Sequence, residues 1–222
     1  MTRGEVVWGI VYLLFQMIFL PSLLGMLLRG IWPAFPSFGI NLIYYSINFL
    51  IIVCILHRYL KKDGSAVVSH LGRLAAVCVI GFVLYWIGNV AVSALIQFRW
   101  PEFFNVNDPA IDAIGRDNLM LTAIGTVVFV PTAEELLYRA LTFGTLRRYN
   151  RILAYLVSVT VFCAIHVVGY IGHYEPTHLA LCYVQYIPAG LVLAGAYEYS
   201  GSIYAPIAIH TAVNLIGILA MR

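Results

Sequence analysis

Residues 126–143 read TVVFVPTAEELLYRALTF, an apolar segment that carries two adjacent glutamates, Glu134 and Glu135, and one arginine, Arg139. An ionised carboxylate at the centre of a bilayer costs roughly 2.5–3.5 kcal/mol on insertion scales, so such groups are kept where they face a protein interior or a wet cavity. On a helix, Glu135 and Arg139 stand at i and i+4 with the acid first, an order that favours an ion pair. Glu134 lies about 100° further round the helix. We therefore expect Glu135 to be neutralised within the fold and Glu134 to be available for chemistry.

The rest of the chain is as apolar as this segment. Of its 222 residues, 62% are hydrophobic and 10% are charged, and the mean hydropathy is +0.89. Because a soluble domain averages roughly 25% charged residues, the composition indicates an integral, multi-pass membrane protein. The apolar stretches fall at approximately 6–28, 40–60, 71–98, 118–146, 151–172, 177–199 and 202–221. We predict an all-α fold, a polytopic transmembrane helical bundle of about seven to eight helices.

Several boundaries need comment. The stretch 6–28 is too long for the apolar region of a signal peptide, so we interpret it as a first transmembrane helix. The stretch 118–146 contains Pro131, so it is either one kinked helix, which we favour, or two pieces that would give an eighth span. The loop from Arg99 to Asp117 is expected to place its Trp and Phe residues at the membrane interface. Glu198, near a helix end, is expected to be solvated.

The placement of Lys and Arg predicts the orientation. With the N-terminus in the cytoplasm, the cytoplasmic side collects Arg3, Arg58, Lys61, Lys62, Arg73, Arg147, Arg148 and Arg151. The opposite side then holds Arg29, Arg99, Arg116 and Arg222. We therefore predict a cytoplasmic N-terminus, and a location in the plasma membrane if the protein is bacterial.

Three further polar residues lie deep in apolar stretches. His166 follows VFCAI, and His210 and Asn214 stand at i and i+4, so their side chains share one helix face. Each residue alone is readily explained as a hydrogen-bonding contact between helices. Together with the glutamates and the arginine, however, they make six polar groups on three helices, and such a set is best explained as one site. We therefore treat 1–222 as a single membrane domain in which 1–117 has little motif content and 118–222 carries the catalytic helices.

These residue types suit the hydrolysis of an amide. A carboxylate beside two imidazoles can deprotonate a water and return the proton to a leaving amine, while His and Asn donors can stabilise an oxyanion. Alternatively, Glu134, His166 and His210 could hold a divalent metal such as zinc that activates the water. The residues leave both schemes open. The sequence has no His-Glu-x-x-His, Gly-x-Ser-x-Gly or Gly-x-Gly-Asp motif, which counts against other classes of hydrolase. It has no Walker A motif either, so nucleotide use is unsupported. We expect neither nucleotide nor nucleic acid as a partner.

Three spaced motifs resemble the signature of a known family. Glu134-Glu135-x-x-x-Arg139, Phe162-x-x-x-His166 and His210-x-x-x-Asn214 occur in the order found in the CAAX protease and bacteriocin-processing (CPBP, or Abi) family of integral membrane proteases. The resemblance covers residues 131 to 217. It implies that Glu134 is the base that activates water and that His166 assists at the water or binds metal. It also implies that His210 and Asn214 form the oxyanion site or complete the metal ligands, while Glu135 and Arg139 order the site.

The leading hypothesis is therefore an intramembrane endopeptidase that cleaves a peptide or a membrane-anchored protein near the cytoplasmic leaflet of the lipid bilayer. One alternative is a non-catalytic immunity or scaffold protein that retains the family site. A proton-coupled transporter using Glu134 is a third reading, but transporters usually show internal repeats, and here the polar groups fall only in the second half of the chain.

Overall fold

The computed structural model describes residues 1–109, 111 and 118–220, which form helices and, within those ranges, no strand. Arg116, Asp117 and Arg222, used above, lie outside the described residues. The first half contains α1 (Arg3–Ile18), α2 (Leu20–Ile31), α3 (Ser37–Ile55), α4 (His57–Val67), a 3₁₀ turn η1 (Val68–His70) and α5 (Leu71–Arg99). The second half contains α7 (Leu119–Ala123), η2 (Ile124–Phe129), α8 (Val130–Glu135), η3 (Leu136–Phe143), α9 (Gly144–Leu146), α10 (Arg151–Val168), α11 (Pro176–Ser200) and α12 (Tyr204–Ala220). The prediction of an all-α bundle is confirmed.

Five helices are long and apolar enough to cross a membrane, namely α3, α5, the continuous helix 119–146, α10 and α11. The helix α12 is apolar but shorter. Large apolar side chains on the outside of the bundle are open to the surroundings, such as Trp8, Leu95 and Phe98. Exposed apolar surface of this extent is typical of a protein that faces lipid. The chain is therefore an integral membrane protein.

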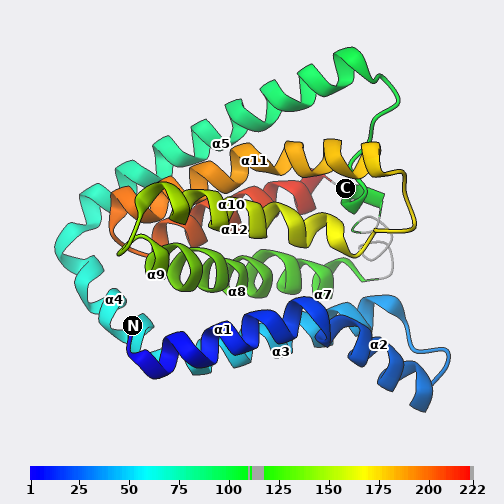
Figure 1. Cartoon of the computed structure of the whole chain (residues 1–222), viewed down its shortest axis with the longest axis horizontal. Helices are drawn as coiled ribbons and strands as arrows, with labels where there is room; N and C mark the ends of the chain where they lie inside the picture. The colour runs from blue at the N-terminus through cyan, green and yellow to red at the C-terminus, as the bar shows by residue number, and fades with distance from the viewer. Residues whose placement is uncertain (110, 112–117, 221–222) are drawn as a thin grey trace.

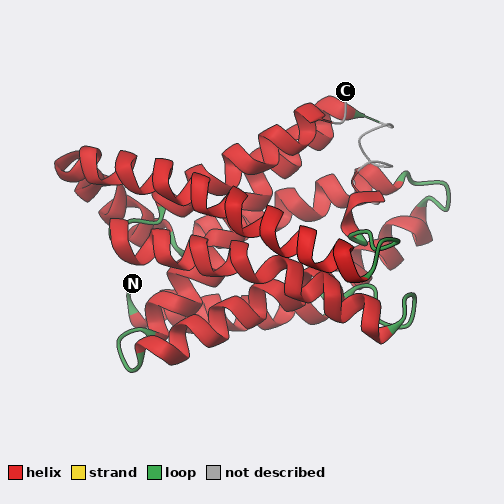
Figure 2. Ribbon diagram, turned by 90° about the horizontal axis from the view of Figure 1, so that it is seen from above, coloured by secondary structure: helices red, strands yellow, loops and turns green. Residues whose placement is uncertain are grey.

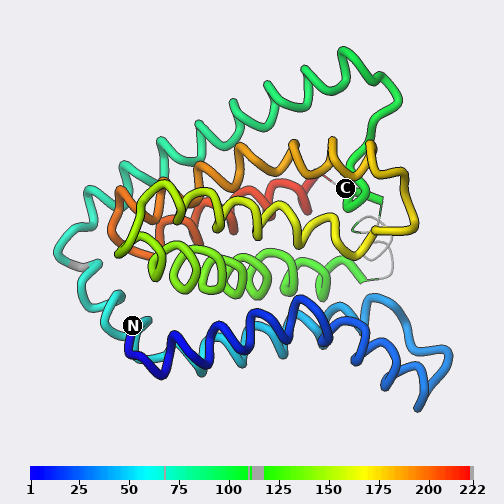
Figure 3. The backbone as a smooth tube through the Cα atoms, viewed as in Figure 1, coloured from blue at the N-terminus to red at the C-terminus, as the bar shows by residue number. Residues whose placement is uncertain are grey.

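The prediction of a single helix over residues 6–28 was wrong. Two helices, α1 and α2, meet there at an angle of 56° and would make one broken span. Pro21 lies in the first turn of α2. A proline has no N–H and its ring crowds the carbonyl four residues earlier, so a helix breaks or kinks where it occurs. The bend is visible in the backbone trace (Figure 3).

The fourth apolar stretch is one continuous helix, Leu119–Leu146, rather than two spans. Its α-helical turns are interrupted by two π-helical segments, η2 and η3, one on each side of α8. This helix occupies the middle of the bundle (Figure 1), with α1 and α3 packed on one side and α10 and α12 on the other. Leu136, Leu137 and Leu141 in η3 are fully buried, so the packed core is centred on this helix.

The remaining helices complete the bundle around that centre. Helix α11 packs against α5, α10 and α12, and the connections lie mostly towards the two ends of the bundle (Figure 2). The N-terminus, α4 and the turn between α9 and α10 share one end (Figure 1). These segments carry most of the lysines and arginines, so the basic residues of the described chain gather at that end.

Helix α4 is tied to the start of α12 by one carboxylate. Asp63 Oδ2 accepts hydrogen bonds from Ser202 Oγ at 2.7 Å and from the backbone N–H of Ile203 at 3.0 Å. The first N–H groups of a helix have no partner within the helix, and Asp63 supplies an acceptor at that point from a distant part of the chain. Burial raises the pKa of Asp63 above its usual value, while these two hydrogen bonds oppose the rise.

Candidate functional site

Glu134 and Glu135 lie at the end of α8, directly before the wide turn of η3. Segments with π-helical hydrogen bonding are rare and often occur at functional sites.

Upstream, the N–H of Val130 donates to the carbonyl of Gly125, five residues earlier. In that pattern the carbonyl of Thr126 would receive its bond from residue 131, but residue 131 is a proline and has no N–H. The carbonyl of Thr126 is therefore left without a donor from its own helix.

Asn214 of α12 supplies the missing donor. Its Nδ2 donates to the Thr126 carbonyl at 2.8 Å. An amide nitrogen carries two hydrogens and its oxygen is a separate acceptor, so this bond leaves half of the donor capacity of Asn214 unused. The contact gives Asn214 a clear structural role, which is to hold α12 against η2 beside the proline.

Glu135 is the centre of a buried ionic cluster. Its Oε1 accepts from Arg139 Nη1 at 3.1 Å and lies 2.8 Å from His210 Nδ1, and both Glu135 and Arg139 are completely inaccessible to solvent. This is the ion pair that the i, i+4 spacing predicted. Arg139 also donates to the carbonyl of Gly190 at 3.4 Å, and its guanidinium lies 4.2 Å from the ring centroid of Phe162.

Glu134 is placed differently from its neighbour. It is half-buried, and its Oε2 is a buried oxygen with no hydrogen-bond partner among the described residues. Tyr44, Tyr138 and His166 lie close enough for its negative charge to act on them. A buried polar atom without a partner is rare and calls for an explanation such as a catalytic role or a bound water. Glu135 Oε2 also lacks a partner among these residues, but Glu135 is held through its Oε1, so Glu134 is the carboxylate of the pair that is not engaged in an ion pair there.

Both histidines are held by the protein through the same ring nitrogen, Nδ1. His166 Nδ1 lies 2.7 Å from the carbonyl of Phe162, and His210 Nδ1 lies 2.8 Å from Glu135 Oε1. Because both partners are acceptors, we assign the proton of each neutral ring to Nδ1. In a neutral ring the Nε2 atom then carries a free lone pair, whereas in a doubly protonated ring it is a donor. Both rings flank Phe162, with centroid distances of 4.7 Å for His166 and 6.2 Å for His210.

These donors do not form a metal cage in the structure. Among the described residues, no three His, Cys, Asp or Glu side chains come close enough together to hold a metal ion. Catalytic zinc sites normally use three protein ligands. Although Glu134, His166 and His210 are of the right type, their placement here does not fit that requirement.

A polar network behind His166 was not foreseen from the sequence. Asn107 Nδ2 donates to the backbone carbonyl of His166 and to Tyr186 Oη, both at 2.9 Å. The Tyr186 ring stacks on the imidazole of His166 with centroids 4.1 Å apart. Asn107 also accepts from Tyr170 Oη at 3.2 Å. The network therefore fixes both the backbone and the ring of His166.

The loop that contributes this network was expected to lie at the interface. Trp100 and Phe104 are exposed, as that prediction requires, but Phe103 is buried, as are Asn105 and Val106. The polar signal was present in the sequence, since Asn105 and Asn107 stand among apolar residues. Sequence spacing does not reveal that this loop folds back onto α10 and α11.

The N-terminal half also contributes polar groups to the site. Tyr44 Oη on α3 donates to Gln16 Oε1 on α1 at 2.9 Å, and Gln16 is fully buried. Tyr45 packs against Gly125 so closely that a Cβ atom there would lie 2.9 Å from its ring. The charge of Glu134 acts on both tyrosines. Residues before 118 therefore form one wall of the site.

Comparison with known proteins agrees with the motifs. Residues 116–216 match the model of the family described as type II CAAX prenyl endopeptidase Rce1-like. A curated relative, UPF0177 protein YbdJ of Lactococcus lactis subsp. lactis (strain IL1403), is 26% identical over 201 residues, covering 83% of this chain and 78% of the relative. No solved structure matches the chain. The matched segment contains all six polar residues that the sequence singled out, so over residues 116–216 this integral membrane protein is similar to the Rce1-like family of type II CAAX prenyl endopeptidases.

Proposed function

We propose that this protein is an intramembrane endopeptidase in which Glu134 activates a water molecule to hydrolyse a peptide bond of a membrane-anchored protein or peptide. The observation that carries the proposal is the Glu134 carboxylate, whose buried Oε2 has no partner among the described residues and which, unlike Glu135, is paired with no arginine or histidine there. A general base must reach the proton that it removes. A carboxylate oxygen held free beside an imidazole meets that need.

The surrounding residues supply the other steps of the reaction. The free Nε2 of His166 would accept a hydrogen bond from the water and orient it, while Glu134 takes the proton. The hydroxide adds to the carbonyl carbon, and Glu134 then delivers the proton to the amine nitrogen as the C–N bond breaks. Glu135, Arg139 and the network behind His166 would hold these groups in place.

His210 would act on the oxyanion. In its neutral form Nε2 is an acceptor, so the ring donates there only as an imidazolium. Glu135 lies 2.8 Å from Nδ1 and would stabilise that cation. The developing negative charge on the substrate oxygen would then be balanced by His210, a form of electrostatic stabilisation that contributes strongly in water-excluded sites. Asn214 retains one hydrogen that could assist.

The test is the appearance of new protein termini in membranes. The wild type, Glu134→Gln and Glu102→Gln would be expressed at matched levels in a bacterial host, and new N-termini would be identified by mass spectrometry. Glu102 is an exposed loop acid and provides the matched control. We expect termini that are present with the wild type and Glu102→Gln and absent with Glu134→Gln. The same termini with Glu134→Gln would refute a catalytic role for this residue.

That experiment also tests the second candidate, a non-catalytic immunity or scaffold protein. Such a protein would keep its phenotype in Glu134→Gln and would generate no termini in any form.

The N-terminus is proposed to be cytoplasmic because basic residues gather at its end of the bundle. The plasma membrane is the proposed location, by analogy with the bacterial source of the relative.

A metal-assisted version of the mechanism is tested separately. Elemental analysis of the purified protein would compare the wild type with the double variant His166→Ala/His210→Ala. Because the donors are not gathered into a three-ligand set, we expect folded, active protein without stoichiometric metal. About one zinc per chain in the wild type, lost in the double variant, would replace the metal-free scheme by one in which the histidines are ligands.

A further inference from the structure

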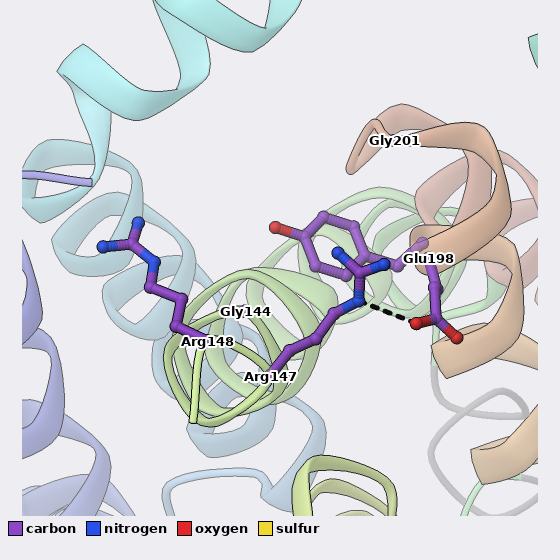
Figure 4. A pocket seen from close by; sticks show the side chains of 6 residues that line it. Gly144, Arg147, Arg148, Glu198 and Gly201 are labelled. Atoms are coloured by element: carbon purple, nitrogen blue, oxygen red, sulfur yellow. Dashed lines mark hydrogen bonds and ion pairs between the residues drawn. The ribbon is translucent and has the colours of Figure 1, made fainter. Parts of the chain in front are cut away.

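A second polar site lies at the end of the bundle, away from the glutamate pair. A cavity of about 220 Å³ opens where the central helix ends and α11 ends, and it is lined by Gly144, Arg147, Arg148, Tyr197, Glu198 and Gly201. Since one water occupies about 30 Å³, the space admits a group several times that size. Figure 4 shows Arg147 and Arg148 extending in diverging directions, with Arg147 reaching Glu198.

Glu198 organises this cavity and is not solvated, contrary to the prediction from its place near a helix end. Its side chain is only 5% exposed. It accepts from Arg147 Nε at 2.7 Å, from Arg151 Nη2 at 3.0 Å and from Tyr155 Oη at 2.7 Å. The prediction failed because these donors come from segments that are distant in sequence. The carboxylate is fully engaged and fixes two guanidinium groups.

The cationic groups retain unused donors. Arg147 uses only Nε in its bond to Glu198, and among the described residues no acceptor takes its two Nη groups. Arg148 is exposed and makes no hydrogen bond or ion pair within that same part of the chain. The cavity lining holds two arginines and one glutamate, and Arg151, outside the lining, also bonds that glutamate, so the site has a net positive charge. The hydroxyl of Tyr197, 3.1 Å from that of Tyr59, adds a polar group to the wall.

We propose that this cavity binds the phosphate group of an anionic membrane lipid. A guanidinium group can donate two parallel hydrogen bonds to the oxygens of one phosphate, and it stays positively charged at all relevant pH values. The cavity lies at the ends of membrane-spanning helices, which is the level of lipid headgroups. Basic pockets between transmembrane helices bind such headgroups. The same oxygens occur in free phosphate, so the experiment must separate the two sources.

The experiment measures thermal stabilisation of the full chain in detergent. Phosphatidylglycerol, phosphatidylcholine with the same acyl chains, and inorganic phosphate would each be titrated against the wild type, Arg148→Gln and Arg73→Gln. Arg73 is another exposed arginine at the same end of the bundle and is the matched control. Because Arg148 has no hydrogen-bond or ion-pair partner among the described residues, its variant is expected to fold, and its melting temperature without lipid checks this.

We expect a saturable stabilisation of the wild type and of Arg73→Gln by phosphatidylglycerol and none by phosphatidylcholine. In Arg148→Gln the lipid should bind about tenfold more weakly, since a hydrogen bond to a charged group contributes about that factor. Equal effects of the two lipids, or equal weakening by Arg73→Gln, would overturn the proposal. Equal stabilisation by inorganic phosphate would overturn the lipid as the source and assign the site to the free anion.

Discussion

Adjacent glutamates should respond in opposite ways to the same chemical change. Glu135→Gln removes the negative charge that faces Arg139 at 3.1 Å and His210 at 2.8 Å, in a region with no solvent access. Removing one partner of a buried ion pair leaves the other charge uncompensated and costs about 3–5 kcal/mol. Glu134→Gln leaves no such charge, because the Glu134 Oε2 atom has no partner to lose in the part of the chain that the structure describes. We expect it to change the free energy of unfolding by less than about 1 kcal/mol.

Two measurements on each variant test this contrast. Unfolding in mixed micelles with increasing denaturing detergent gives the difference in stability, and the formation of new termini in membranes gives the activity. Glu134→Gln should be stable and inactive, whereas Glu135→Gln should be strongly destabilised. Glu135→Gln contains an amide oxygen that can still accept a hydrogen bond, so any loss reports mainly on charge. A stable Glu135→Gln with a destabilised Glu134→Gln would refute the division of roles between the two acids.

Three further changes have defined outcomes. Asn214→Leu should lower the free energy of unfolding by about 1–3 kcal/mol, because it leaves the Thr126 carbonyl unsatisfied. Adding Pro131→Ala, which supplies an N–H, should recover part of this loss. An equal cost of Asn214→Leu in the wild type and in Pro131→Ala would contradict the bond assignment. Tyr186→Phe keeps the aromatic ring stacked on His166 but removes the tyrosine hydroxyl. Cleavage should therefore slow, while the free energy of unfolding falls by only about 1 kcal/mol. Unchanged cleavage kinetics would show that the network is not needed to position His166. Asp63 has a raised pKa in the fold, so its contribution to stability is fully present below the usual carboxyl value and is lost as the pH rises through the folded pKa. Unfolding measured from pH 3 to 7 should therefore show the stability of Asp63→Asn rising relative to the wild type, and a pH-independent difference would contradict the shift.

Local spacing predicted the parts of the site that lie on one helix. The pairing of Glu135 with Arg139 follows from 3.6 residues per turn and needs no knowledge of the rest of the fold. The broken first span had a local signal too, in Pro21, but the length of the apolar run outweighed it. In each case the information was contained within a few neighbouring residues.

Contacts between distant segments were not accessible in this way. Asn107 approaches His166 from a loop 59 residues earlier, and Glu198 is covered by arginines from another part of the chain. Tyr44 forms part of the site although its helix carries no recognisable motif. Such contacts depend on how helices pack, and one apolar helix surface resembles another in sequence. The residues of the three motifs were therefore predictable, whereas the groups that hold them in place were not.

The position of α12 has a consequence for biosynthesis. His210 and Glu135 are 75 residues apart in sequence, and Asn214 and Thr126 are 88 apart. Both bonds join the central helix to α12, which leaves the ribosome after all the other described helices. Until α12 docks, Glu135 can pair with Arg139 on its own helix, but the imidazole of His210 and the donor for the Thr126 carbonyl are missing. A nascent chain would therefore insert the other described helices before the site of the proposed endopeptidase was complete, and its synthesis would itself delay the onset of the proposed cleavage.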